Sequence, residues 1–419
     1  MLVEVRISNF RSFKNEVVLS MEPYTLNGKK KNLIETSFHK VPYVFKSLGL
    51  FGANASGKTN VIRVFAYLKY LMNIGSSQKK DDRFIDERYR FSEEFLKKPT
   101  HIQIKFLKGS ILYEYAISLT AEKILEESAF FSDLSASARI NRIFTRKINE
   151  NDSYDFSLSK GIKKSWGNEV LPQRVFLADM VNNRKADKKE LLDIYNFIQK
   201  DVFLVESKEV LFNTVVKRMI QDDKVRQRVV AFTKEADLGL QDIIFRPVSK
   251  EDFFEEFEKR NIDLTKKEEL FNKMHPVEVI ASHKTEEGEV VHTDFSLSES
   301  AGTQAYFALS EIVLTVLKEG KILLIDELDS ELHPFLVKKL VNLFNNGETS
   351  AQLIFTSHAH YLMDGETLTR DQIWFTSKEN GFYTDLYPLS DFGDKRIDLD
   401  FYKSYLRGIY GAVPRIMES

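Results

Sequence analysis

A glycine-rich loop that ends in lysine and threonine carries the clearest chemistry in this sequence. It fits the pattern G-x-x-x-x-G-K-[ST] and consists of Gly52, Ala53, Asn54, Ala55, Ser56, Gly57, Lys58 and Thr59. A loop of this kind directs backbone N–H groups and the positive end of a helix at a polyphosphate. We expect the Lys58 ammonium to contact the β- and γ-phosphates of a nucleotide and the Thr59 hydroxyl to bind Mg²⁺.

Two adjacent carboxylates and one histidine follow apolar segments in the last third of the chain. Asp326 and Glu327 end the run Ile-Leu-Leu-Ile, and His358 follows the run Leu-Ile-Phe-Thr-Ser. The carboxyl ends of parallel strands open onto the ligand crevice of a sheet. We therefore expect Asp326 to support Mg²⁺ and Glu327 to orient or deprotonate the attacking water. A histidine at such a strand end can donate to the γ-phosphate, although a purely structural role for His358 is the alternative.

A second anion-binding feature is predicted at residues 297–304, with the sequence Leu-Ser-Glu-Ser-Ala-Gly-Thr-Gln, before a helical segment. Serine and glycine at a helix N-terminus bind anions through free N–H groups. Ser300 and Gly302 are the candidates. It would be unusual for one subunit to use a second phosphate-binding site for the same nucleotide.

Three further residues have weaker claims to the site. Arg11 and Phe13 lie after the opening strand, where an ATP-binding lobe could place a cation and an aromatic ring near the base. Equally, Phe13 could be a core residue and Arg11 a solvated turn residue. Gln103 is the nearest glutamine that could reach the γ-phosphate, but an ordinary strand position is the better interpretation.

The elements that must position these residues alternate between strands and helices. Residues 47–51 form a short buried strand, and the apolar spacing of 59–72 predicts a helix. Further strands are expected at 2–7, 16–21, 101–106 and 111–117, the last two joined by a turn at 108–110. Charged segments with helical spacing occupy 188–200, 209–236 and 251–273, without a sustained heptad pattern.

Composition limits the class of protein. With 419 residues, 43% hydrophobic and 29% charged, the chain is long enough for two or three folded cores. The net charge of −2 gives no global attraction for nucleic acid or anionic lipid. There is no cysteine, which excludes disulfides and thiolate metal sites. The apolar run at 305–317 is interrupted and too short to cross a bilayer, so we expect a cytoplasmic protein without a membrane segment.

The order of these motifs resembles an ABC-type ATPase of the SMC and RecF-like group. Three stretches are similar, more narrowly, to bacterial AAA-family ATPases of abortive-infection type, including RloA-like and OLD-like proteins. They are Asn-Phe-Arg-Ser-Phe at 9–13, Asp-Glu-Leu-Asp-Ser-Glu-Leu-His-Pro at 326–334, and Tyr-Leu-Arg-Gly-Ile-Tyr-Gly-Ala-Val-Pro at 405–414.

The resemblance implies an α/β P-loop NTPase fold, an ABC-type ATPase head with a mixed β-sheet and an inserted, mostly helical subdomain. The expected parts are 1–120 and 291–419 for the ATPase domain, and 121–290 for a partly helical lid or interaction region. It also implies a homodimer with ATP sandwiched between subunits. Ser300 and Gly302 would then bind the partner's γ-phosphate, Asp329 and Ser330 would cross the interface, and Glu327 would be the catalytic base. The motif Ser-Ala-Gly-Thr-Gln, with Gln304, departs from the Leu-Ser-Gly-Gly-Gln of transporters, which bears on the contact across the dimer.

Three functions fit this interpretation. The first is an Mg-dependent ATPase that senses or regulates a separate effector, a nuclease or toxin, in antiphage defence. The second is an SMC- or RecF-like DNA-binding ATPase of repair, with weak basic candidates at 29–31 and 139–147. The third is a slowly hydrolysing, ATP-locked scaffold. Too few residues follow His358 for a TOPRIM nuclease domain, so we expect no nuclease in this chain, and we interpret the aspartates between 385 and 400 as an acidic tail loop.

Overall fold

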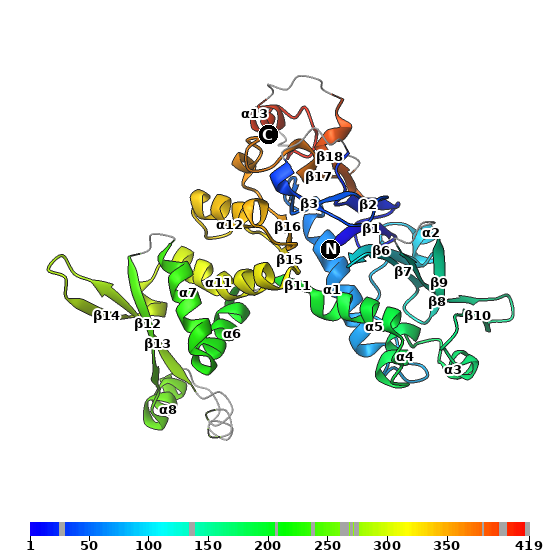
Figure 1. The fold of residues 1–419 in the computed structure, drawn as a ribbon, viewed down its shortest axis with the longest axis horizontal. Helices are drawn as coiled ribbons and strands as arrows, with labels where there is room; N and C mark the ends of the chain where they lie inside the picture. Colours follow the sequence, from blue (N-terminus) through cyan, green and yellow to red (C-terminus); the bar gives the residue numbers. More distant parts are fainter. Residues whose placement is uncertain are drawn as a thin grey trace. The chain divides into compact units, whose positions relative to one another are not determined.

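The computed structural model describes residues 1–24, 30–133, 139–205, 208–235, 239–259, 268, 271, 276–378, 381–393 and 400–414. They form two compact units, shown in Figure 1. The larger comprises Met1–Glu206, Val316–Asp329 and Val337–Ser419, and the smaller comprises Ser207–Thr315 and Ser330–Leu336.

A six-stranded mixed sheet forms one layer of the larger unit. Its order is β11-β15-β16-β5-β17-β18, and only β18 runs antiparallel to its neighbour. The strands are β5 (Ser47–Phe51), β11 (Val202–Val205), β15 (Ile322–Ile325), β16 (Gln352–Thr356), β17 (Ile373–Ser377) and β18 (Asp385–Pro388). β5, β15, β16 and β17 are buried along their whole length, as the apolar runs require in a sheet covered on both faces.

A seven-stranded antiparallel sheet, β10-β9-β8-β7-β6-β1-β2, forms the second layer. Its strands are β1 (Leu2–Ser8), β2 (Val17–Ser20), β6 (Thr100–Lys108), β7 (Ile111–Leu119), β8 (Ile124–Asp133), β9 (Ile140–Ile148) and β10 (Tyr154–Leu158). A small hairpin, β3 (Leu33–Glu35) with β4 (Tyr43–Phe45), completes the strands described in this unit. The two sheets share one hydrophobic core cluster, to which Val5 and Leu48 both belong.

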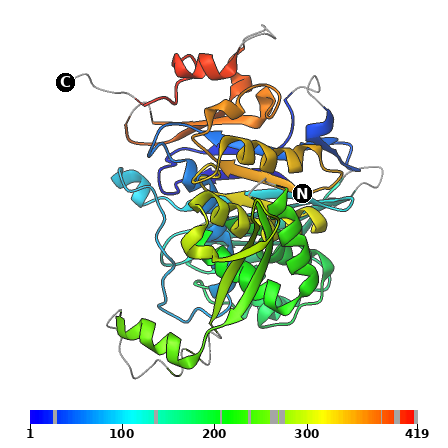
Figure 2. The same ribbon diagram turned by 90° about the vertical axis from the view of Figure 1, so that its left-hand side faces the viewer.

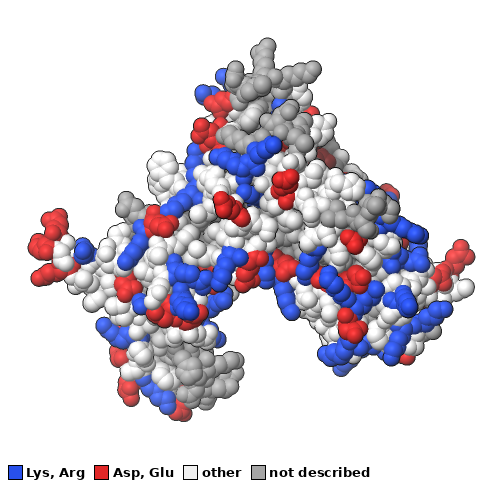
Figure 3. All heavy atoms as spheres, viewed as in Figure 1, with Lys and Arg blue, Asp and Glu red and all other residues white. Residues whose placement is uncertain are grey.

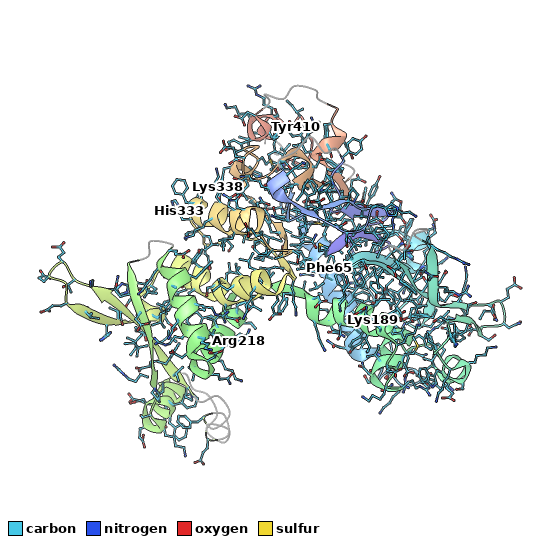
Figure 4. All side chains as sticks on the ribbon, viewed as in Figure 1. Phe65, Lys189, Arg218, His333, Lys338 and Tyr410 are labelled. Carbon is cyan, nitrogen blue, oxygen red and sulfur yellow. The ribbon has the colours of Figure 1, made fainter. Side chains whose placement is uncertain are left out.

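Helix α1 (Lys58–Ile74) belongs to that same core cluster through Val61 and Phe65. Figure 4 labels Phe65 on this helix. The other helices described in the larger unit are α2 (Glu93–Leu96), α3 (Lys164–Glu169), α4 (Phe176–Asn182), α5 (Lys189–Asn196), the π-helical η2 (Phe197–Asp201), α12 (Pro334–Asn346), which begins in the smaller unit, and α13 (Phe401–Leu406), with 3₁₀ turns η1 (Lys30–Asn32), η4 (His360–Leu362), η5 (Arg370–Gln372) and η6 (Leu389–Asp391). In Figure 2 the red α13 lies at the same end of this unit as the orange strands β17 and β18.

The smaller unit combines helices with a three-stranded antiparallel sheet around its own core. The sheet is β12 (Leu240–Pro247), β13 (Val277–Lys284) and β14 (Val290–Asp294); the helices are α6 (Lys208–Gln221), α7 (Asp223–Lys234), α8 (Lys250–Lys259), α10 (Phe295–Ser298) and most of α11 (Ala301–Glu319), which ends in the larger unit. Val229, Ile243 and Phe307 are buried together. An ion pair of 2.6 Å joins Arg218, labelled in Figure 4, to the Glu311 carboxylate.

Most predicted elements are present at the expected places. The strand at 47–51, the helix after the glycine loop and the hairpin of β6 and β7 are confirmed. The segment 209–236 is two helices and not one, because the Asp222 side chain accepts a hydrogen bond from the Lys224 N–H and so starts α7. The segment 251–273 lies partly outside the described residues.

The boundaries of the two units differ from those expected at 121 and 290. Residues 121–205 belong to the larger unit, because β8, β9 and β10 extend the sheet that β6 and β7 begin. The smaller unit contains a sheet, where a mostly helical subdomain was expected. Among the described residues, no helix has both the length and the apolar character needed to span a membrane.

Candidate functional site

The loop between β5 and α1 has the backbone geometry that its glycines permit. Gly52 has a φ of +148° and Gly57 a φ of +109°, which side-chain-bearing residues rarely adopt. A Cβ on Gly57 would lie 2.3 Å from the Thr384 hydroxyl oxygen and 2.8 Å from that of Ser12. Both glycines are therefore required by the local packing as well as by the turn.

Lys58 is held over its own loop. Its ammonium donates to the Gly52 carbonyl oxygen at 2.9 Å and to the Ala53 carbonyl oxygen at 3.1 Å. Burial lowers the pKa of Lys58, and the carboxylates of Asp326 and Glu327 act in the opposite direction. The loop thus presents a partly desolvated cation, whose interaction with an anion is stronger than it would be in water.

Three side chains from three elements meet at the carboxyl end of the parallel strands. The hydroxyls of Thr59 and Thr356 donate to Asp326 Oδ1 at 3.1 and 2.6 Å. Thr356, at the end of β16, also accepts from the Glu327 backbone N–H at 2.8 Å. β15 and β16 are adjacent and parallel, so the sheet itself brings the carboxylates beside the glycine loop.

Glu327 adopts a left-handed backbone conformation with φ +51°, which is uncommon for a residue that carries a side chain. Its backbone bond to Thr356 holds it at the sharp turn after β15. Such strain is characteristic of functional positions in folded proteins.

His358 lies two residues beyond Thr356, the buried end of the neighbouring strand β16. Its backbone N–H donates to both oxygens of Asp329, at 3.1 and 3.2 Å. Burial and the positive charge of Lys58 lower the pKa of the His358 imidazole below 6.5, and Asp329 and Glu327 oppose the shift. The imidazole is therefore neutral at pH 7, with one nitrogen able to donate and the other able to accept.

These groups line one polar cleft of about 490 Å³ in the larger unit. Its lining consists of Asn54, Ala55, Ser56, Gly57, Lys58, Thr59, Asn60, Arg63, Glu327, Thr356 and His358. The structure thus brings together residues from the glycine loop, the Asp-Glu strand end and the histidine strand end. Arg63, an exposed residue on α1 one turn after Thr59, was not predicted; its helical spacing from Thr59 was the available signal.

The residues present fit a magnesium ion bound together with a nucleotide. Mg²⁺ is commonly held by one or two protein oxygens, with phosphates and waters completing its shell. Thr59 and Asp326 supply a hydroxyl and a carboxylate 3.1 Å apart at the edge of the cleft. Within the described residues there is no cluster of three or more His, Asp or Glu side chains that could hold a metal by itself.

Arg11 does not line the cleft. Its guanidinium pairs with Glu87 at 3.2 Å, and burial lowers the pKa of this guanidinium. Phe13 is completely buried in the core, which is the alternative stated above. Ser12, which lies between Arg11 and Phe13, is the residue through which this turn reaches the glycine loop. Its hydroxyl accepts hydrogen bonds from Asn60, at the start of α1, and from Thr384, just before β18, each at 2.7 Å. Gln103 is an ordinary residue of β6, paired with Arg6 and Ala116.

Ser300 and Gly302 lie in the smaller unit, at the start of α11. The Ser300 hydroxyl accepts from the Thr303 N–H at 3.1 Å and so caps the helix. A Cβ on Gly302 would lie 2.7 Å from the Glu331 carbonyl oxygen, so this position admits only glycine without a shift of the backbone. The Gln304 amide donates to the carbonyls of Ser296 and Glu299, each at 3.0 Å, and so closes the preceding turn.

Comparison with known proteins places this site in a family. The family model described as "AAA domain, putative AbiEii toxin, Type IV TA system" matches residues 47–364. The DNA replication and repair protein RecF of Clostridium botulinum (strain Eklund 17B / Type B) is 24% identical over 335 residues, which cover 77% of this chain and 89% of that protein.

Solved structures of SMC heads are also similar. The SMC head domain from Thermotoga maritima is 14% identical with a TM-score of 0.43, and the alignment covers 92% of this chain and 98% of that one. The SmcHead bound to the C-winged helix domain of ScpA is 15% identical with a TM-score of 0.41, covering 92% and 97%. The family match spans well over half of the chain and includes the glycine loop, the Asp-Glu strand and the histidine strand. The chain has an α/β P-loop NTPase fold and belongs to the family described as "AAA domain, putative AbiEii toxin, Type IV TA system".

Proposed function

We propose that this protein binds Mg–ATP in the cleft of the larger unit, hydrolyses it between two copies of the chain, and thereby regulates a separate effector in antiphage defence. The observation that carries the proposal is the convergence of Lys58, Glu327, Thr356 and His358 on one cleft, with Asp326 bonded to two threonines at its edge. These groups come from positions far apart in the sequence, and their assembly supports a common task.

Each group has a role that its position suits. The loop N–H groups and Lys58 bind the phosphates, while Thr59 and Asp326 would hold Mg²⁺. The bound ion neutralises charge on the phosphate oxygens. Glu327 accepts a proton from water as the water oxygen bonds to the γ-phosphorus and the bond from phosphorus to the bridging oxygen of ADP breaks. Neutral His358 donates a hydrogen bond to the γ-phosphate and loses that contact when phosphate leaves.

Dimerisation follows from the second anion-binding feature, at the start of α11. Ser300 is exposed at the start of α11, so the free N–H groups of this helix N-terminus can bind the γ-phosphate of a nucleotide held by another copy. ATP then bridges two subunits, and hydrolysis removes the contacts that hold them closed. An arginine in place of Ser300 should abolish ATP-dependent dimers, measured by light scattering, while leaving ATP binding by the monomer intact.

The defence role rests on resemblance and on the family's description. The three stretches shared with RloA-like proteins, together with a family described by a toxin of a toxin–antitoxin system, favour a cytoplasmic regulator of a toxin or nuclease. In this proposal the larger unit supplies the nucleotide site of the ATPase, and the smaller unit contacts the effector. Co-purification of a neighbouring gene product with the ATP-bound protein, but not with the ADP-bound protein, tests this part.

A DNA-linked role is the second candidate, favoured by the similarity to a protein described in replication and repair. The basic stretch at 139–147 contributes less free positive charge to the surface than its composition suggests. Arg146 is completely buried, and the exposed Lys147 pairs with Glu126 at 3.5 Å; Arg139 and Arg142 are exposed as well. Figure 3 shows acidic and basic residues interspersed over the visible face. Salt-sensitive DNA binding that strengthens with ATP would favour this candidate over the regulator.

The decisive experiment compares the wild-type protein with Glu327→Gln. Without the carboxylate base, steady-state phosphate release should fall at least about a hundredfold, since general-base catalysis contributes that much or more. Mg–ATP binding should persist and the ATP-bound dimer should accumulate. Glu348→Gln, which changes an exposed carboxylate of the same unit, is the matched control and should hydrolyse ATP like the wild type. Failure of the wild type to bind Mg–ATP would overturn the proposal, and wild-type turnover too slow for cycling would favour the ATP-locked scaffold.

A further inference from the structure

The C-terminal segment 400–414 is bonded directly to the glycine loop. The Ala53 N–H donates to the Ala412 carbonyl oxygen at 2.8 Å. The same carbonyl oxygen accepts a second hydrogen bond, of 3.1 Å, from the Tyr405 hydroxyl. The Ala53 carbonyl oxygen in turn accepts a hydrogen bond from the Lys58 ammonium at 3.1 Å. A continuous series of hydrogen bonds therefore runs from Tyr405 to the phosphate-binding lysine.

The segment is built so that its chain returns to this point. After α13, Gly408 and Gly411 adopt φ values of +75° and +64°, and Ala412 follows with φ +59°. Two backbone bonds, from the Gly408 N–H to Tyr405 and from the Gly411 N–H to Gly408, close the reversal. The two glycines adopt these values freely, but the left-handed conformation is costly for Ala412 unless the surroundings require it, and here it accompanies the hydrogen bond of the Ala412 carbonyl with Ala53.

Tyr405 is anchored on its other side by aromatic packing. Its side chain is nearly completely buried, and its ring stacks on Phe375 of β17 at 5.5 Å with an interplanar angle of 5°. The ring of His360 lies 4.5 Å away, in the turn that follows the cleft histidine, and the His360 N–H donates to the His358 carbonyl at 2.9 Å. Burial raises the pKa of Tyr405 to about 12, so its hydroxyl remains a hydrogen-bond donor throughout the neutral range.

We propose that Tyr405 is a positioning residue for the nucleotide site, which fixes Ala53 and Lys58 through the Ala412 carbonyl before nucleotide binds. The proposal rests on the proposed function, because it assigns a role in ATP binding. In this proposal, residues 405–414 support the glycine loop structurally. They are one of the three stretches that resemble AAA-family ATPases of abortive-infection type. Tyr405 touches no phosphate, so its loss should act on affinity and not on the chemical step.

The test is Tyr405→Phe in the full-length protein. This change keeps the ring that packs on Phe375 and deletes only the hydroxyl. Removing one hydrogen bond from a preorganised loop should raise the Kd of Mg–ATP, measured with a fluorescent ATP analogue, and the KM for ATP about three- to tenfold. The kcat should change less than about twofold, and the melting temperature should confirm that the variant is folded.

Tyr387→Phe is the matched control. The Tyr387 hydroxyl donates to the Tyr410 carbonyl at 2.9 Å, in the same segment but two residues before the carbonyl that faces the loop; Figure 4 labels Tyr410 there. Weaker ATP binding by Tyr405→Phe alone would support the proposal. Equal weakening by both variants would mean that general stability of the segment is responsible, and would overturn it. Unchanged binding by Tyr405→Phe, with normal binding by wild type, would overturn this inference and leave the proposed function standing; wild type without affinity for Mg–ATP would refute both.

Discussion

Replacing Thr356 by valine tests how the carboxylates of the cleft are held. Thr356 is completely buried, and its single hydroxyl serves two residues: it donates to Asp326 Oδ1 at 2.6 Å and accepts from the Glu327 N–H at 2.8 Å. Valine has nearly the same shape and suits a strand, so the change removes these two bonds and leaves the packing.

The expected loss in the free energy of unfolding can be calculated from those two hydrogen bonds. A hydrogen bond to a charged carboxylate contributes about 1.5–3 kcal/mol and a neutral one about 0.5–1.5 kcal/mol, so Thr356→Val should destabilise the larger unit by about 2–4.5 kcal/mol. For a unit of this size that corresponds to a melting temperature lower by roughly 3–7 °C. Turnover should fall at least tenfold as well, because Glu327 and Asp326 lose the group that orients them.

Two variants control this experiment. Thr356→Ser keeps the hydroxyl and should retain most of both stability and turnover. Thr367→Val removes a buried hydroxyl that donates to the Asp364 carboxylate at 3.0 Å, away from the cleft. It should lower the melting temperature while leaving turnover unchanged. Thermal unfolding by circular dichroism and steady-state phosphate release give the two readouts. If Thr356→Val lost stability but hydrolysed ATP like the wild type, the hydroxyl would have no part in orienting the carboxylates.

Two other perturbations have defined outcomes. Gly57→Ala should abolish Mg–ATP binding in a filter assay, because the new Cβ would lie 2.3 Å from the Thr384 hydroxyl at φ +109°, whereas Gly109→Ala, at φ +59° with open space, should bind normally. Burial lowers the pKa of His360 from 6.5 to about 4, so the unfolded chain binds a proton that the folded protein excludes between these values. Stability should therefore decline as pH falls from about 6.5 to about 4. His360→Phe, which retains an aromatic ring beside Tyr405, should flatten that decline in melting temperature, and an unchanged slope would refute the assignment.

Much of the site was predictable because its motifs are local. The glycine loop, the Asp-Glu pair and the strand-end histidine each depend on a few adjacent residues and on the edge of a parallel sheet, where separate strand ends meet. The strands and the first helix followed from apolar periodicity in the same way. The residues that bind and hydrolyse nucleotide in the proposal are consequently those with the strongest sequence signals.

Residues whose roles depend on distant partners were not predictable. Thr356 is an ordinary strand threonine until the fold brings it to Asp326, and the bond between Ala412 and Ala53 joins opposite ends of the chain. In the sequence, Glu127 looks like any other charged residue. In the structure it is completely buried, and its carboxylate accepts hydrogen bonds from the Tyr115 hydroxyl and from the N–H groups of Phe176 and Leu177. No local pattern distinguishes such a carboxylate from a solvated one. The ion pair of Arg11 with Glu87 was not predictable for a related reason, since Glu87 belongs to a loop without a motif.

The arrangement of the six-stranded sheet has a consequence for how the protein is made. Within the described part of the chain, β5 pairs with β16 and β17, and both of these strands are translated after the smaller unit. During synthesis the emerging β5 therefore lacks partners for its backbone N–H and C=O groups while its apolar side chains are uncovered, and such a segment is prone to pair with other chains. The phosphate loop cannot be an autonomous early folding module. Nascent chains arrested before β16 should require chaperones to avoid aggregation, and release of the complete polypeptide should be the step that commits this unit to its native state.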